Sequence, residues 1–406
     1  MAAFQLPSNI VQREAYISRV KPFIGKSVAK VFTGQRRVGK SYMLFQLIQL
    51  ILDNDPEANI IYINKEDIAF DEIKTAADLN DYILKKASQQ KKNYIFIDEI
   101  QEITGFEKAV RSLLLDENND VYITGSNAKL LSGELATFLA GRTIEINVYS
   151  LSYAEFLSFH KLTDTDRNLL KYFKYGGLPY LINLNLRDDI VFEYLKNIYT
   201  TIVFRDVIAR YNLRNINFLE RLVKFLADNT GSIFSAKRIS DFLKSQKINL
   251  AHNQVQAYTD YLTNAFLIHK VSRYDIKGKR IFETGEKYYF ENSGLRNAIV
   301  GYKPGDKAKL LENIVYNQLL FKGCEVKTGQ LETEEIDFVA IKNNETTYVQ
   351  VSLTLNNQKT IDREFGNLLK IKDNYPKMVV TMEEQGINTY KGIPVIPVRK
   401  FLLESS

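Results

Sequence analysis

The segment from Gly34 to Ser41 constrains the fold of this 406-residue chain more than any other feature. It matches the pattern G-x-x-x-x-G-K-[ST], follows the strand candidate 30–33 and precedes a helix expected from Tyr42. The glycines let successive backbone N–H groups turn inward around phosphates, and the helix N-terminus adds partial positive charge. Lys40 would then reach the β- and γ-phosphates, and the Ser41 hydroxyl would bind Mg²⁺. The predicted nucleotide-binding residues are Gly34, Gln35, Arg36, Arg37, Val38, Gly39, Lys40, Ser41 and Tyr42.

Two adjacent carboxylates, Asp98 and Glu99, end the apolar strand candidate 94–97. Asp98 is expected to hold Mg²⁺ through its water shell, and Glu99 to polarise the attacking water as general base. Such a pair alone could be a solvated turn. Beside the glycine-rich loop, it predicts that the chain binds and hydrolyses Mg-ATP.

Further polar residues follow later strand candidates. Ser126 or Asn127 could touch the γ-phosphate or the lytic water, and we take Asn127 as the candidate catalytic residue. Arg142, just before the strand candidate 144–146, could neutralise transition-state charge or could be a surface arginine. The sequence leaves open whether Arg142 acts within its own subunit or across an interface.

Short apolar runs alternate with helical periodicity over residues 1–150, which predicts an α/β domain with a parallel sheet of the P-loop NTPase type. The strand candidates are 30–33, 60–63, 94–97, 121–124 and 144–146.

The rest of the chain is predicted to form three further parts. Residues 151–216 are expected to be a helical lid, and 303–406 a small α/β domain. In 217–302, helices 236–245 and 253–265 precede strand candidates 266–274 and 279–283. Helix, turn, helix and hairpin in this order predict a winged helix-turn-helix.

The composition narrows the choice of cofactors and partners. With 54 Lys+Arg against 48 Asp+Glu, the net charge of +6 permits contact with nucleic acid without requiring it. One cysteine and three scattered histidines argue against a disulfide and a zinc site. No apolar run is long enough for a membrane span, so we expect a soluble, cytoplasmic protein without membrane contact.

The chain resembles the AAA-type (AAA+-related, STAND-like) P-loop ATPases of bacteria and archaea that carry a winged-helix middle and a C-terminal restriction-endonuclease-like domain of unknown function. The matching runs are Gly34 to Ser41, Ile95 to Gln101, Thr124 to Leu131, Gly141 to Phe156, Gly176 to Pro179 and Lys287 to Leu295. The resemblance implies that Asp98 and Glu99 are the magnesium and catalytic carboxylates, and that Asn127 lies in the sensor segment. It also implies that Arg142 precedes the fifth strand and that Arg13 lies near the nucleotide base or a domain seam.

The predicted winged helix gives mixed signals for DNA. Its presumed recognition helix, 252–260, contains no Lys or Arg, although DNA affinity comes chiefly from phosphate contacts. The hairpin is more basic, since Arg273, Lys277, Lys279 and Arg280 could grip a phosphate backbone. A solvated turn is the alternative, so DNA remains a weak candidate partner.

The C-terminal part offers an incomplete nuclease site. Glu312 and Asp337 could hold a metal, but the strand that should supply E-x-K reads Gln350-Val351-Ser352. Gln350 brings no charge, and Ser352 cannot replace a lysine ammonium. A degenerate domain with a binding or dimerisation role is therefore predicted.

Four functions remain open. The preferred one is a regulatory switch driven by ATP, with a protein partner or self-association. The others are an ATP-dependent nuclease or nucleic-acid-processing enzyme, a DNA-binding regulator controlled by ATP, and a ring-shaped remodelling ATPase.

Overall fold

The structure is a computed structural model of the full chain. It describes residues 6–8, 10–128, 139, 141–245, 251–278, 280–281 and 285–404, without the side chain of Arg280. Within these residues the chain forms two compact units. The first unit comprises residues 1–149 and 264–266, and the second comprises 150–263 and 267–406.

The first unit is built on a five-stranded sheet in the order β2-β3-β4-β1-β5, and every neighbouring pair is parallel. All five predicted strands are confirmed. The elements are α1 (Glu14–Val20), β1 (Ala29–Thr33), α2 (Lys40–Asn54), β2 (Asn59–Asn64), α3 (Ala76–Lys86), β3 (Asn93–Asp98), α4 (Phe106–Leu113), β4 (Asn119–Gly125) and β5 (Thr143–Asn147). This is the α/β fold with a parallel sheet that is typical of P-loop NTPases.

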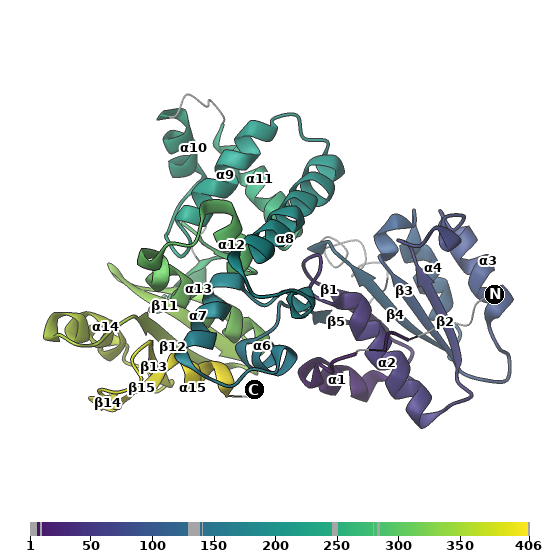
Figure 1. Cartoon of the computed structure of the whole chain (residues 1–406), viewed down its shortest axis with the longest axis horizontal. Coiled ribbons are helices and arrows are strands. Elements are labelled where there is room, and N and C mark those ends of the chain that lie inside the picture. Colours follow the sequence, from purple (N-terminus) through teal and green to yellow (C-terminus); the bar gives the residue numbers. More distant parts are fainter. Residues whose placement is uncertain are drawn as a thin grey trace. The chain divides into compact units, whose positions relative to one another are not determined.

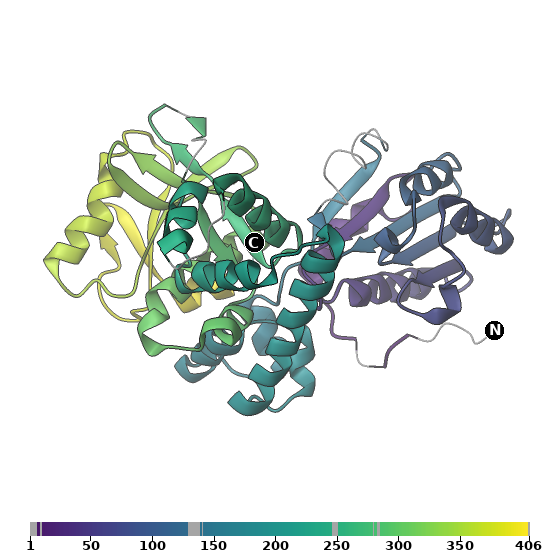
Figure 2. The same cartoon turned by 90° about the horizontal axis from the view of Figure 1, so that it is seen from above.

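Apolar strand residues explain why helices cover this sheet. Alternate residues of β1, β2, β3 and β4 form one buried cluster with the apolar faces of α3 and α4. On β3 and β4, Phe96 and Tyr122 stack with ring centroids 4.4 Å apart. Figure 2 shows the strands side by side between helices.

The strand order brings three strand ends together. Because β4 lies between β3 and β1, their carboxyl ends meet at one edge of the sheet. Thr124 of β4 is level with Phe32 of β1, and Ile123 is level with Ile97 of β3. Nucleotides bind at such an edge in open α/β sheets.

The second unit begins with helices and ends in a large mixed sheet. Its helices are α6 (Tyr153–His160), α7 (Asp166–Tyr175), α8 (Asp188–Thr201), a π-helix (Ile202–Ala209), α9 (Ile216–Asp228), α10 (Ala236–Ser245), α11 (His252–Asn264), α12 (Ser293–Val300), α13 (Lys307–Phe321), α14 (Gln358–Lys370) and α15 (Val398–Leu403). Its strands are β6 (Ile268–Val271), β7 (Arg273–Asp275), β8 (Arg280–Ile281), β9 (Lys287–Phe290), β10 (Glu325–Leu331), β11 (Glu334–Lys342), β12 (Glu345–Ser352), β13 (Lys377–Thr381), β14 (Thr389–Tyr390) and β15 (Ile393–Pro397). The eight-stranded sheet has the order β14-β15-β13-β12-β11-β10-β7-β8.

Two apolar clusters cover this sheet. Phe338 and Val349 pack with α13, whereas Ile336 and Tyr348 pack with Phe365 of α14. The first cluster also contains residues of α6 and α7, so the predicted lid segment 151–216 packs with the C-terminal strands in one compact unit. Figure 1 shows α14 beside β12 and β13. The division of this unit into lid, winged helix and nuclease-like parts stays a prediction.

The predicted hairpin is partly wrong. The strand expected over 266–274 is two strands, because β6 pairs with β9 while β7 pairs with β8 and, in parallel, with β10. The Thr328 N–H donates to the carbonyl of Ser272, between β6 and β7, at 3.0 Å. This bond begins the pairing that takes β7 into the large sheet. Lys279, predicted to lie at the tip of this hairpin, is outside the described residues.

No described helix has the length and apolar composition of a membrane span.

Candidate nucleotide site

The loop between β1 and α2 has the backbone that phosphate binding requires. Gly34 and Gly39 have φ angles of 145° and 97°, values that L-residues rarely adopt. A Cβ on Gly34 would lie 2.1 Å from the carbonyl oxygen of Val148. The ammonium of Lys40, buried inside the loop, donates to the carbonyls of Gly34 and Gln35 at 3.0 Å each. The backbone carbonyls of the loop therefore fix the position of the Lys40 ammonium.

Side chains at the strand ends connect this loop to β3. Asp98 accepts side-chain hydrogen bonds from Ser41, at the start of α2, and from Thr124 of β4. Tyr62 of β2 places its hydroxyl 3.5 Å from the other oxygen of Asp98. Burial raises the pKa of Asp98, and the adjacent Glu99 charge adds to this effect, while the two hydrogen bonds oppose it. Ser41 and Asp98, predicted from separate motifs to bind magnesium, are thus brought together.

Glu99 is held by more groups than the sequence suggested. Its backbone is in the left-handed region, with φ 54° and ψ 52°, and its N–H donates to the Thr124 hydroxyl at 2.9 Å. Its carboxylate accepts a hydrogen bond from Gln101 and another, at 3.2 Å, from Ser126. Burial alone would raise the pKa of Glu99, but Lys40 and the Gln101 hydrogen bond bring it below its usual value. Glu99 is therefore a buried, ionised carboxylate facing the phosphate loop.

Two arginines and a tyrosine lie around the loop. Arg36 contacts Glu66 at 3.1 Å, and its charge helps to lower the pKa of Glu99. Arg13 is buried and donates to the carbonyls of Val38 and Tyr149 at 3.2 and 3.0 Å. Arg13 therefore connects the backbone of the phosphate loop to the backbone after β5. Tyr42 is 47% exposed, so its ring is accessible at the start of α2.

The remaining predicted residues are less closely tied to this site. Asn127 is buried just beyond β4, but the bond to Glu99 comes from its neighbour Ser126. Arg142 is exposed and precedes β5, whose first residue is level with Ala29 at the start of β1. The phosphate loop follows the other end of β1, about 13 Å away at 3.3 Å per residue. This register argues against contact between Arg142 and the γ-phosphate of its own chain, so only a role across a subunit interface stays a prediction.

Sequence reasoning missed Thr124, Gln101 and Tyr62. Their signals are weak, since a polar residue at a strand end or two residues past a carboxylate is common. What distinguishes Thr124 is its position between β1 and β3, which only the strand order reveals.

The nuclease-like candidates lie in the second unit. Glu312 is on α13, Asp337 on β11, and Gln350 and Ser352 on β12. The strand β12 carries no lysine at Ser352, but Lys287 of β9, which the sequence analysis did not consider, contacts both carboxylates. The expected basic hairpin tip is also reduced, since Arg273 donates to Gln330 and Lys277 pairs with Glu332.

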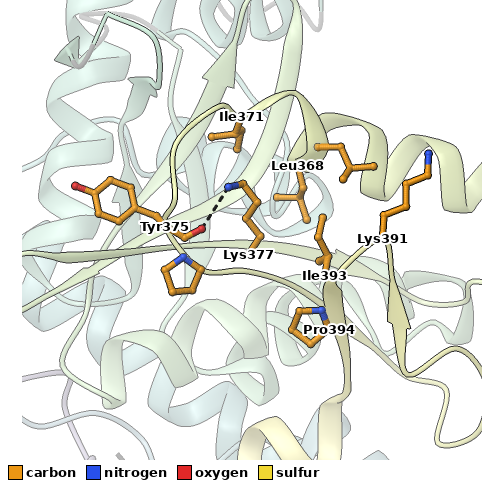
Figure 3. A pocket seen from close by; sticks show the side chains of 10 residues that line it. Leu368, Ile371, Tyr375, Lys377, Lys391, Ile393 and Pro394 are labelled. Atoms are coloured by element: carbon orange, nitrogen blue, oxygen red, sulfur yellow. Dashed lines mark hydrogen bonds between the residues drawn. The ribbon is translucent and has the colours of Figure 1, made fainter.

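A surface cavity of about 430 Å³ lies in the second unit, between α14 and the starts of β13 and β15. Apolar side chains such as Leu368 and Ile393 line it, together with Lys391 and Lys377, whose ammonium donates to the Tyr375 carbonyl at 3.3 Å (Figure 3). No carboxylate or histidine is among its lining residues.

Comparison with known proteins agrees with this geometry. Residues 26–157 match the family described as AAA domain (AAA_14), and residues 166–306 match a domain of unknown function, DUF8612. A protein of Haemophilus influenzae, described only as an uncharacterized protein, is 38% identical over 403 residues, covering 97% of this chain and 99% of the relative. The chain belongs to this family of AAA-domain proteins. An uncharacterized protein of Methanocaldococcus jannaschii is 32% identical over 339 residues, covering 79% of this chain and 71% of the relative.

Solved structures resemble the AAA-domain chain only distantly. The Walker-type ATPase of Pyrococcus abyssi covers 72% of this chain and 96% of its own at 15% identity, with a TM-score of 0.49. The RuvB Holliday junction branch migration motor of Thermotoga maritima covers 64% and 90% at 14% identity, with a TM-score of 0.33. At these scores, neither likeness informs the function of this chain.

Proposed function

We propose that this AAA-domain protein binds Mg-ATP at the β1–α2 loop and hydrolyses it to ADP and phosphate as a regulatory molecular switch. One observation carries the proposal. Ser41 of the phosphate loop donates a hydrogen bond to Asp98 of β3, and the positive charge of Lys40 lowers the pKa of Glu99. The two halves of an ATPase site, identified from separate segments of sequence, therefore meet in one buried cluster.

The residues present fit a magnesium-bound nucleotide. Gly34 leaves room where any side chain would collide with Val148, and Lys40 lies within the loop with an ammonium that could turn to phosphate oxygens. Hydroxyl and carboxylate oxygens from Ser41 and Asp98 are the hard ligands that Mg²⁺ prefers. When bound, the ion would neutralise phosphate charge.

Each side chain then has a distinct task. Lys40 would bind the β- and γ-phosphates, and Ser41 and Asp98 would hold the ion. Glu99, ionised and buried, would accept a proton from the attacking water. Thr124 would fix the distance between Asp98 and Glu99, because its hydroxyl bonds to the carboxylate of one and to the N–H of the other.

The switch reading rests on how firmly Glu99 is held. Gln101 and Ser126 both donate to one oxygen of its carboxylate, which makes that oxygen less ready to accept a proton from water. A regulatory switch requires slow hydrolysis, because the ATP-bound state of the protein must last long enough for a partner to bind it. The partner would be another protein or a second copy of the chain, acting in the cytoplasm.

The alternative is an ATP-dependent protein that binds or cleaves nucleic acid through the second unit. It predicts DNA-stimulated turnover or metal-dependent cleavage that is sensitive to Glu312 and Asp337. The predicted recognition helix, which is rich in amides but has no Lys or Arg, and the engaged Arg273 count against tight DNA binding.

The deciding experiment measures Mg-ATP hydrolysis by wild type and Glu99→Gln, with and without double-stranded DNA, and follows DNA integrity in the same reactions. We expect Glu99→Gln to bind ATP without turnover, and DNA to be neither stimulatory nor cut. Undiminished turnover in Glu99→Gln would contradict the assigned base. Stimulation by DNA, or its cleavage, would replace the switch with the nucleic-acid function.

A further inference from the structure

A buried lysine stands at the centre of the carboxylates of the second unit. Lys287, on β9, is 2% exposed. Its ammonium lies 2.7 Å from Glu312 Oε1 of α13, 2.6 Å from Glu335 Oε1 and 3.6 Å from Asp337 Oδ1, both of β11. A single positive charge thus joins a helix and two strands that are distant in sequence.

The surrounding groups occupy further oxygens of this cluster. The Tyr289 hydroxyl donates to the same Glu312 oxygen at 2.6 Å, and the Val351 N–H donates to Asp337 Oδ2 at 2.8 Å. The amide oxygen of Gln350 accepts the Asp337 N–H at 3.2 Å, so the backbone already uses it. One oxygen each of Glu312 and Glu335 and both oxygens of Asp337 therefore face Lys287 or have other partners.

Electrostatics explains why a cation must be present. A carboxylate taken out of water costs several kcal/mol unless a positive charge or hydrogen bonds compensate it. Asp337 is 8% exposed and lies close to Glu312 and Glu335. In sites of this architecture a divalent ion can meet that demand. Here the Lys287 ammonium offsets part of that cost, and across the described residues no group of three or more His, Cys, Asp or Glu is arranged to hold a metal ion.

We propose that the Lys287 ammonium is the permanent cation of this cluster, replacing a divalent ion and tying β9 to α13 and β11. The carboxylate cluster of the second unit then holds a lysine where a metal ion would otherwise lie. Removing the ammonium leaves Glu312, Glu335 and Asp337 without their counter-ion, so that they attract a divalent cation. This inference does not rest on ATP hydrolysis.

The test compares the full chain with Lys287→Met, which keeps the aliphatic stem, and with Lys303→Met, which removes a lysine that is 58% exposed. All carry Asp98→Asn and are studied without nucleotide, so that the ATP site does not contribute. Mn²⁺ binding is measured by electron paramagnetic resonance, and stability by thermal unfolding with and without Mn²⁺.

We expect Lys287→Met to unfold at lower temperature and to bind Mn²⁺ about tenfold more tightly than the other two, because carboxylates without a counter-ion attract a hard cation. Mn²⁺ should restore part of its stability, and adding Glu312→Gln should abolish the binding. If Lys287→Met folds but gains no Mn²⁺ binding, the proposal fails.

The unmodified cluster provides a test that does not depend on the folding of Lys287→Met. In the chain that keeps Lys287, Glu312→Gln should leave Mn²⁺ binding unchanged. This chain should also not nick a supercoiled plasmid in the presence of Mn²⁺. Glu312-dependent binding together with nicking would overturn the proposal, because Lys287 would then be the ammonium of a working nuclease site.

Discussion

The hydroxyl of Thr124 donates to the carboxylate of Asp98 across the β4–β3 pair, and the same oxygen accepts the N–H of Glu99. One methyl-bearing side chain therefore sets the positions of both acidic residues of the proposed ATPase site. Such a hydroxyl is a positioning group, since it acts through Asp98 and Glu99.

Replacing Thr124 by Val should keep the shape of the side chain and remove both hydrogen bonds. We expect ATP turnover to fall about 10- to 100-fold with smaller changes in ATP affinity, because misplaced catalytic groups lose transition-state stabilisation. Steady-state kinetics and fluorescent-nucleotide binding measure the two quantities. Thr230→Val is the control, since Thr230 is buried in the second unit and bonds to main-chain carbonyls. Equal losses in both variants would assign the effect to general stability.

Gln101 offers a prediction with the opposite sign. Its amide donates to the Glu99 carboxylate, which Ser126 also contacts. In Gln101→Leu, Glu99 should be freer to meet water, and basal turnover should rise about two- to tenfold, the net value of one hydrogen bond. Pre-steady-state phosphate release measures this rate. A fall in turnover would show that Gln101 orients the base instead of restraining it.

The residues that the sequence could identify are those whose chemistry fixes both residue type and spacing. The loop from Gly34 to Ser41 and the pair Asp98-Glu99 are contiguous, so their roles could be inferred before the fold was known. Thr124 and Ser126 are different, because strand register decides which side chain of that segment meets Glu99. The same kind of register places Arg142 at the end of β1 that is opposite to the phosphate loop, which the sequence alone could not indicate.

The second unit shows a further limit of sequence analysis. The sequence pattern indicates a helix over 310–321 and strands over 325–327, 335–341 and 347–353, which correspond to α13, β10, β11 and β12. Lys287 could not be connected to Glu312, because its strand β9 gains its place by pairing with β6. The pairing partner of β7 could not be predicted either, because a strand of three residues is too short for its sequence pattern to indicate which sheet it joins.

Gly34 provides a test of the loop backbone. Gly34→Ala would force a Cβ against the Val148 carbonyl at a φ angle of 145°. We expect ATP affinity to fall at least about tenfold, because a strained residue of this kind costs on the order of 1–3 kcal/mol and displaces the loop. Isothermal titration with ATP measures the affinity. Gly305→Ala is the matched control, since a Cβ there meets open space. Unchanged affinity in Gly34→Ala would show that the loop adopts another backbone when it binds nucleotide.

His160, at the end of α6, gives the stability of the second unit a dependence on pH. Its ring packs on Phe156 with centroids 4.5 Å apart, and its Nε2 is buried without a hydrogen-bond partner among the residues that the structure describes. Burial, assisted by the charge of Lys171, lowers the pKa of His160 to about 4 from its usual 6.5. Between pH 6.5 and pH 4, His160 binds a proton in the unfolded chain but not in the folded chain. The free energy of unfolding therefore decreases as the pH falls from 6.5 towards 4.

His160→Phe should remove this loss while keeping an aromatic ring against Phe156. Unfolding midpoints of wild type and variant are compared at pH 8, 6 and 5, and their difference is the informative quantity, since the other titrating groups are common to both. The variant should gain on wild type as the pH falls, with most of the gain below pH 6.5. A difference that stays constant from pH 8 to pH 5 would mean that the His160 ring accepts its proton in the folded state, and so that burial does not keep it neutral.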